Sequence, residues 1–93
     1  MTEKQFQRQV IQLAKLLGWS VYHTFLSRRS QPGYPDLTLW KRGRGVIFAE
    51  LKSASGVLRP EQKTTIASMK AAGLVVYVWR PLDLQVIAEI LGE

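Results

Sequence analysis

The hydrophobic pattern opens with an amphipathic helix over residues 2–17. Thr2 is followed three residues later by Gln5, which is the spacing of a capping box at a helix N-terminus. Gly18 ends the segment, because glycine readily adopts the conformation that follows the last helical turn. The apolar residues between these limits recur at the spacing of one helical face; they are Phe6, Val10, Leu13, Ala14 and Leu17.

Proline opens two further segments with helical spacing. Pro60 stands where a first helical residue can lack its N–H, and this helix ends at Gly73 with Ile66 and Met69 on its inner face. Pro81 opens the last helix of the chain. The expected inner face of that helix consists of Leu82, Val86, Ile87 and Ile90.

Four runs have the composition of β-strands. Residues 19–26 are aromatic and β-branched, and residues 36–40 and 46–52 flank a glycine-rich basic turn, so the latter two are expected to pair as a hairpin. Residues 74–79 form an unbroken apolar run, which is typical of a strand buried on both faces. The predicted order is α-β-β-β-α-β-α, an α/β fold with a mixed central sheet flanked by helices. Without a repeat, linker or low-complexity tract, we expect one domain over residues 1–93.

Charge and composition narrow the class of partner. The net charge of +6 favours a polyanion, and nucleic acid over a membrane. No stretch approaches the roughly 20 apolar residues of a membrane helix, and the polar N-terminus lacks the apolar segment of a signal peptide. The chain has no cysteine, which excludes a disulfide framework and a thiolate zinc site and fits an intracellular, cytoplasmic protein.

Two carboxylates are expected to meet across the hairpin. If Trp40 faces Val46, the same register places Asp36 opposite Glu50, and alternation puts Lys52 on the same face. Like charges directly opposite each other destabilise a sheet. A bound cation would remove this repulsion, so the pattern predicts a metal site.

A structural interpretation of the same residues is the alternative. Asp36 then merely starts a strand after a proline turn, and Glu50 and Lys52 are solvated on an exposed face. Trp40 and Phe48 share that face and suggest that it is at least partly covered, which favours the functional interpretation. The opposite face of the hairpin is apolar and consists of Leu37, Leu39, Ile47, Ala49 and Leu51.

The polar residues of the hairpin resemble the motif of the PD-(D/E)XK nucleases. Pro35-Asp36 matches its first element and Glu50-Leu51-Lys52 matches E-x-K. The leading acidic helix and the glutamine-bearing helix after the lysine are similar to the virus-type replication-repair nuclease (VRR-NUC) domain. The resemblance rests on residues 33–37, 48–52 and 60–62, spans essentially the whole chain, and implies a restriction-endonuclease-like fold in a stand-alone, phage-like member.

The resemblance implies a Mg²⁺ site, with Mn²⁺ as a substitute. Asp36 and Glu50 would supply carboxylate ligands and Leu51 its backbone carbonyl, since such hard cations take oxygen ligands. Lys52 would orient the attacking water and offset the charge that develops in the transition state.

Two helical residues join the expected catalytic site. Glu3 precedes Phe6 by one turn and so faces inward; the resemblance favours a metal ligand over a residue that only interacts with the helix dipole. Gln62 precedes Ile66 by one turn, and a buried glutamine needs hydrogen-bond partners. The catalytic residues or a phosphate would provide them; otherwise Gln62 is a satisfied polar residue at the rim of the core.

Basic residues near the motif are candidate DNA contacts. Arg28 and Arg29 precede it, and we expect them to bind the phosphate backbone. Lys41, Arg42 and Arg44 lie in the turn at the far end of the hairpin. We expect a solvated turn there, with a remote contact to a long duplex as the alternative.

The histidine and the three tryptophans are not expected to bind the metal or to stack on bases. His23 is expected to be structural or adjacent to substrate, not a metal ligand. The three tryptophans are expected in the core or an interface rather than as stacking platforms for bases; they are Trp19, Trp40 and Trp79.

The activity implied by the resemblance is a metal-dependent, structure-selective DNA endonuclease. Its substrate would be branched DNA, such as a four-way (Holliday) junction or a flap, inside a bacterium or a phage-infected host cell. Resolving a junction takes two symmetric cuts, so a C2 homodimer is expected, with residues 74–79 and the last helix as candidate interface elements. The alternatives are a nucleic-acid-binding module with a vestigial nuclease site and a small adaptor whose charge is incidental.

Overall fold

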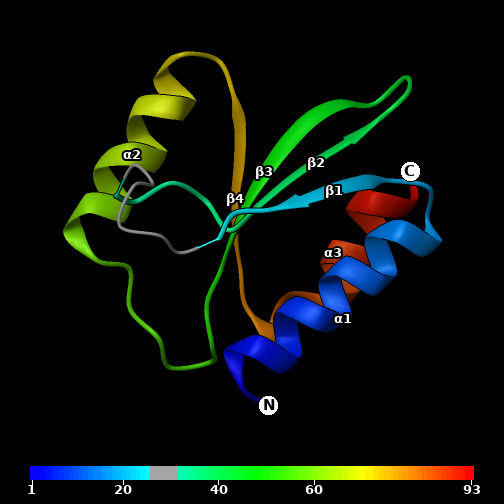
Figure 1. Ribbon diagram of the computed structural model, residues 1–93, viewed down its shortest axis with the longest axis horizontal. Coiled ribbons are helices and arrows are strands. Elements are labelled where there is room, and N and C mark those ends of the chain that lie inside the picture. The colour runs from blue at the N-terminus through cyan, green and yellow to red at the C-terminus, as the bar shows by residue number, and fades with distance from the viewer. Residues whose placement is uncertain (26–31) are drawn as a thin grey trace.

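The computed structural model describes residues 1–25 and 32–93 and has a mixed α/β architecture (Figure 1). The α-β-β-β-α-β-α order predicted from the sequence is confirmed. The strand expected over residues 19–26 is shorter and ends at His23. The elements are α1 (Glu3–Leu16), β1 (Ser20–His23), β2 (Leu37–Lys41), β3 (Gly45–Leu51), α2 (Pro60–Ala71), β4 (Val75–Trp79), the 3₁₀ turn η1 (Pro81–Asp83) and α3 (Leu84–Gly92).

The four strands form one sheet in the order β1-β2-β3-β4. β2 pairs antiparallel with both β1 and β3, whereas β4 runs parallel to β3 after the crossover through α2. Trp40 pairs with Val46 and Leu37 with Ala49, so the predicted hairpin register is confirmed.

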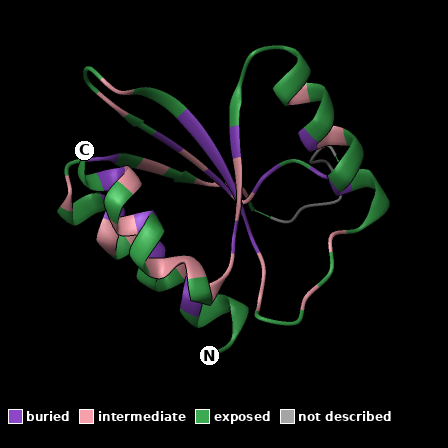
Figure 2. Ribbon diagram, turned by 180° about the vertical axis from the view of Figure 1, so that it is seen from behind, coloured by how far each residue is buried: buried purple, intermediate pink, exposed green. Residues whose placement is uncertain are grey.

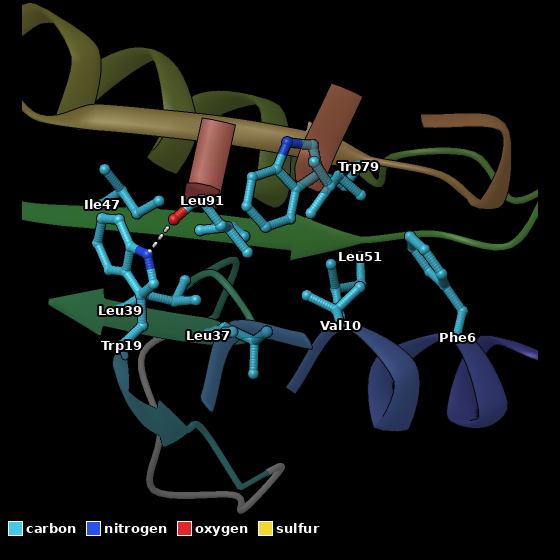
Figure 3. Packing of buried hydrophobic residues seen from close by; sticks show 12 residues of the cluster. Phe6, Val10, Trp19, Leu37, Leu39, Ile47, Leu51, Trp79 and Leu91 are labelled. Atoms are coloured by element: carbon cyan, nitrogen blue, oxygen red, sulfur yellow. Dashed lines mark hydrogen bonds between the residues drawn. The ribbon is translucent and has the colours of Figure 1, made fainter. Parts of the chain in front are cut away.

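Helices α1 and α3 lie side by side over one face of the sheet, and α2 lies over the other (Figure 1). The first face holds the main core, and Figure 2 shows its buried residues along α1, α3 and the central strands. Within it, Trp19 Nε1 donates a hydrogen bond to the carbonyl of Leu91 at 2.8 Å, which joins the start of β1 to the end of α3 (Figure 3). The five apolar hairpin residues expected on one face are all buried here: Leu37, Leu39, Ile47, Ala49 and Leu51.

The N-terminus of α1 is fixed by the predicted capping box. The Gln5 backbone N–H donates to Thr2 Oγ1 at 3.1 Å, and the Thr2 N–H donates to Gln5 Oε1 at 2.9 Å. Phe6, Val10 and Ala14 then face the core. This arrangement holds Glu3 in the first turn of α1, beside the carboxyl-terminal end of β3.

The second face of the sheet is only partly covered. Helix α2 covers β3 and β4, where Phe48, Ile66 and Val76 form a smaller apolar cluster. Among residues 1–25 and 32–93, no element covers this face over β1 and β2, where Tyr22 is 56% and Trp40 is 45% exposed. The expected cover therefore exists at Phe48 but not at Trp40, and of the three tryptophans only Trp19 and Trp79 belong to the core.

Two predictions for the C-terminal part of the chain are confirmed only in part. β4 contacts both core clusters, through Val76 on one face and Trp79 on the other, but it is the outermost strand, and Leu74 and Val75 near its start are exposed. The inner face of the last helix also differs in part from that expected: Ile87 is buried as predicted, but the 3₁₀ turn changes the phase before α3 begins. Leu82 is 93% exposed and Val86 is exposed as well. The buried residues of α3 are Ile87 and Leu91.

The hairpin turn is not the solvated turn that the sequence suggested. Lys41 Nζ donates to the carbonyl of Leu17 at 2.8 Å. Arg44 donates to the carbonyls of Ile90 and Glu93, and its guanidinium lies 5.2 Å from the centre of the Trp19 ring. Because the turn lies against the ends of α1 and α3, these two cations satisfy terminal carbonyls. Of the three basic turn residues, Arg42 alone is exposed.

None of the helices in residues 1–25 and 32–93 has the length and hydropathy needed to cross a bilayer.

Candidate active site

Three carboxylates from distant parts of the chain converge at one end of the sheet. Glu3 comes from α1, Asp36 immediately precedes β2, and Glu50 lies near the end of β3. One oxygen of each can be chosen so that all three lie within 4.8 Å of one another. They line a pocket of about 240 Å³ with four further residues, Lys52, Val57, Arg59 and Gln62.

Asp36 is held by backbone groups on both sides. Its Oδ2 accepts a hydrogen bond from the N–H of Leu51 at 2.7 Å, and its backbone carbonyl accepts one from Thr24 at 2.8 Å. The carboxylate of Asp36 is thereby turned toward β3 and Glu50. Leu51 thus contacts the site through its N–H, and the metal-ligand role of its carbonyl stays a prediction.

The turn before Asp36 is packed against α2. Gly33 has φ of +85°, and a Cβ at this position would overlap the backbone carbonyl of Glu61 in the first turn of α2. Thr65 Oγ1 donates to the carbonyl of Pro32 at 3.2 Å. Glycine is therefore required here both by its φ and by the close approach of two backbones. The contact sets the distance between Asp36 and α2.

Glu50 is 2% exposed and has one oxygen that is satisfied and one that is not. Its Oε2 accepts a hydrogen bond from Gln62 Nε2 at 3.0 Å and lies 3.6 Å from Lys52 Nζ. Its Oε1 is buried and has no hydrogen-bond partner among the described residues. A buried unsatisfied carboxylate oxygen is costly, so its presence calls for a further ligand or a proton.

The surroundings of Glu50 favour its protonated form. Burial and, after it, the negative charge of Asp36 raise the pKa of Glu50 from 4.5 to about 8, against the opposing effect of Lys52. In the absence of a cation, the raised pKa therefore favours a protonated Glu50 at neutral pH.

Gln62 connects the acidic cluster to the start of α2. It is 5% exposed, its Oε1 accepts from the N–H of Arg59 at 2.8 Å, and its Nε2 donates to Glu50. These two bonds fix which end of the amide faces the carboxylate. Gln62 thus lies where the sequence placed it, on the buried stripe of α2 and beside the catalytic candidates.

The site offers the ligands of a hard divalent cation. When Glu50 is ionised, the three carboxylates outnumber the two cations of the pocket, Lys52 and Arg59, and the cluster contains no histidine or cysteine. Mg²⁺ and Mn²⁺ prefer such oxygen ligands, whereas softer metals favour nitrogen and sulfur. The unsatisfied oxygen of Glu50 indicates that these residues fit a metal ion.

Some candidates lie elsewhere, and one pocket residue was missed. Arg28 and Arg29 fall outside the described residues. His23 is not part of the acidic cluster and lies on the neighbouring side of Asp36, with Gln7. Arg59 lines the pocket although the sequence analysis did not select it; its position next to a helix-opening proline, three residues before Gln62, was the available signal.

The fold and this site define the chain as an α/β domain of nuclease type. Its hairpin presents an aspartate and an E-x-K tripeptide between two helices that contribute a glutamate and a glutamine. The family model described as the VRR-NUC domain matches residues 3–81, and the chain belongs to this family. The match includes every residue of the acidic pocket, whereas α3 lies beyond it. Neither a curated protein nor a solved structure matches the sequence.

Proposed function

We propose that this protein is a metal-dependent, structure-selective DNA endonuclease that hydrolyses phosphodiester bonds in branched DNA, such as four-way junctions or flaps. Family membership implies the nuclease-type function. The observation that carries the metal dependence is the buried Glu50 beside Asp36, with one oxygen lacking a partner among the described residues. A protein that did not use this pair would gain stability by losing one of the charges.

Asp36, Glu50 and Glu3 would hold the metal ion, with the carbonyl of Leu51 as a further ligand. When bound, Mg²⁺ or Mn²⁺ would supply a Lewis acid for the scissile phosphate and a water of lowered pKa. The three carboxylates come from separate parts of the chain, and the fold holds them within reach of a single ion before any ion arrives. Such preorganisation lowers the cost of ordering the site on binding.

Lys52 and Gln62 act on either side of Glu50. Lys52 lines the pocket with a side chain that is only 12% exposed, and its ammonium group would offset charge on the phosphate and orient the attacking water. Gln62 holds Glu50 in place through its amide hydrogen. We therefore assign catalysis to Asp36, Glu50, Lys52 and Gln62.

Binding of DNA would rest on the net charge of +6 and on Arg28 and Arg29 near the motif.

Two symmetric cuts at a junction require two sites, so we propose a C2 homodimer. Its interface would use the edge strand β4 and the exposed apolar side chains of the C-terminal segment, Leu82 and Val86. Light scattering of the purified protein would show a mass of twice 10.6 kDa; a monomer at micromolar concentration would contradict this part.

Cleavage of a labelled four-way junction tests the proposal. The wild-type protein should cut the junction and a flap in Mg²⁺ or Mn²⁺, cut linear duplex poorly, and cut nothing in EDTA. Asp36→Ala should abolish both Mg²⁺ binding and cleavage. Lys52→Met should reduce cleavage by at least about 100-fold while DNA binding persists, and Lys70→Met, which changes an exposed lysine on α2, serves as its control.

The outcomes separate this function from a binding module. Salt-sensitive DNA binding without cleavage in either metal would show that the nuclease site is vestigial. Equal cleavage by the wild type, Asp36→Ala and Lys52→Met would show that the proposed site is not where hydrolysis occurs.

A further inference from the structure

A second, larger pocket adjoins the acidic one. It has a volume of about 530 Å³ and shares two of its walls, Glu3 and Asp36, with the smaller pocket that holds Lys52 and Gln62. The two hollows therefore meet at the carboxylates. The other lining residues come from the N-cap and first turns of α1 and from the end of β1 with the two residues that follow it: Thr2, Lys4, Gln7, His23, Thr24 and Phe25.

The shared carboxylates are rigidly connected to the walls of this larger pocket. Gln7 follows Glu3 by one turn of α1 and so lies on the same side of the helix. Thr24 donates its backbone N–H to the carbonyl of Asp36 at 2.8 Å, directly between His23 and Phe25 in the chain. A group held in this pocket thus borders the two carboxylates that would hold the metal.

Two aromatic rings, those of His23 and Phe25, and the side-chain amide of Gln7 line this pocket. Gln7 Nε2 lies 3.0 Å from His23 Nε2, within hydrogen-bonding distance. The rings of His23 and Phe25 are in contact, with centroids 5.3 Å apart and planes at 42°. Phe25 is 71% exposed. A flat aromatic ligand with hydrogen-bonding edges is the complement to such walls.

We propose that this hollow is a base pocket, which receives one unpaired nucleobase from the nucleotide next to the scissile phosphate. The base would stack on the ring of Phe25, while Gln7 hydrogen-bonds its edge. Lys4 places a positive charge at the rim, where the adjoining phosphate would pass. This inference rests on the proposed nuclease function and names the feature of the DNA that the site selects.

The base pocket explains structure selectivity without contacts to a distant branch. A base in an intact duplex must be unpaired and unstacked before it can enter, which disfavours duplex DNA. At a junction, a flap or a frayed end, the base beside the branch point is already unpaired or is readily released. The pocket volume also lies in the range of sites that hold a ligand of nucleoside size.

Abasic substrates test the base pocket in the cleavage reaction. Matched flap DNAs carry an intact base or an abasic residue on either side of the cut. Loss of the base on one side should slow cleavage by the wild type about tenfold or more. Phe25→Leu and Gln7→Ala should lose this dependence on the base, whereas Phe25→Tyr and Gln9→Ala, which changes an exposed glutamine of α1, should keep it. Equal rates on all substrates would overturn the proposal.

Photochemical cross-linking tests the base pocket without cleavage. In Ca²⁺, a flap carrying 5-iododeoxyuridine beside the cut should cross-link to His23 or Phe25, as located by mass spectrometry. Cross-linking to Trp40 or Tyr22 on the open sheet face instead would overturn the base pocket. Absence of cleavage in Mg²⁺ and Mn²⁺ would reject the nuclease function alone, since the cross-link still reports where the base lies.

Discussion

Replacing Glu50 by glutamine should stabilise the metal-free protein and abolish its response to Mg²⁺. Glutamine has the shape of a protonated glutamate and can still accept the hydrogen bond from Gln62 at 3.0 Å. It carries no charge to bury beside Asp36. The substitution therefore removes a destabilising group and a metal ligand together, and the two effects have opposite signs in the same experiment.

The magnitude follows from the titration of Glu50. Its pKa is about 8 in the folded protein against an ordinary value of 4.5. Because the pKa is raised, the folded state keeps its proton between these values while the unfolded state has lost it. The contribution of Glu50 to stability is thus fully present below pH 4.5 and is lost as the pH rises to about 8. The loss is about 1.4 kcal/mol per pH unit, or on the order of 3 kcal/mol at pH 7.

Urea denaturation in EDTA at pH 5, 6, 7 and 8 measures this effect. The free energy of unfolding of the wild type should fall with pH relative to that of Glu50→Gln. In thermal unfolding at pH 7, the midpoint of the variant should lie about 10 °C higher or more. Glu89→Gln, which removes an exposed carboxylate on α3, should leave the slope unchanged. Mg²⁺ should stabilise only the proteins that retain Glu50. A Glu50→Gln protein that is no more stable than the wild type at pH 7 to 8 would refute the reasoning.

The remaining predictions concern the turn, the metal and the helix cap. Gly33→Ala should lower the free energy of unfolding by about 2–4 kcal/mol in urea denaturation, because its Cβ overlaps the carbonyl of Glu61. Gly43→Ala, where φ is +82° and the described structure leaves open space, should lower it by about 1 kcal/mol. Equal losses would show that the contact with α2 is unimportant. Calorimetry should find Mg²⁺ affinity rising up to about tenfold per pH unit from pH 6 to pH 8, with release of a proton from Glu50, and a pH-independent affinity would contradict this. Thr2→Ala should lower the free energy of unfolding by about 1 kcal/mol and weaken Mg²⁺ binding through Glu3; unchanged stability would show that the capping box is not required.

The hairpin and its site could be predicted because their determinants are local. Alternation along the strands and a short turn fix which side chains share a face, so one pairing, Trp40 with Val46, places Asp36 and Glu50 together. The capping box at Thr2 and the stripe that includes Gln62 are equally local. The register and the helices were therefore readable from residues close to one another in the chain.

The errors lie where distant elements decide the outcome. An apolar run shows that β4 belongs to a sheet, but not that it is the edge strand with Val75 exposed. The 3₁₀ turn before α3 shifts its buried face to Ile87 and Leu91. Likewise, Arg44 contacts carbonyls at the end of α3, some 46 residues away in the chain. No local periodicity carries this information.

The identity of Gln62 shows how the site constrains the sequence beyond its ligands. Helix α2 begins after Arg59, whose side chain makes no capping hydrogen bond, and its N–H is satisfied by Gln62 Oε1 instead. A glutamate at this position would satisfy that N–H equally well, since capping boxes use either residue. Only the amide can also donate a hydrogen bond to Glu50 and add no further charge beside Asp36. The helix therefore accounts for a capping residue at position 62, and the acidic pair accounts for its being glutamine.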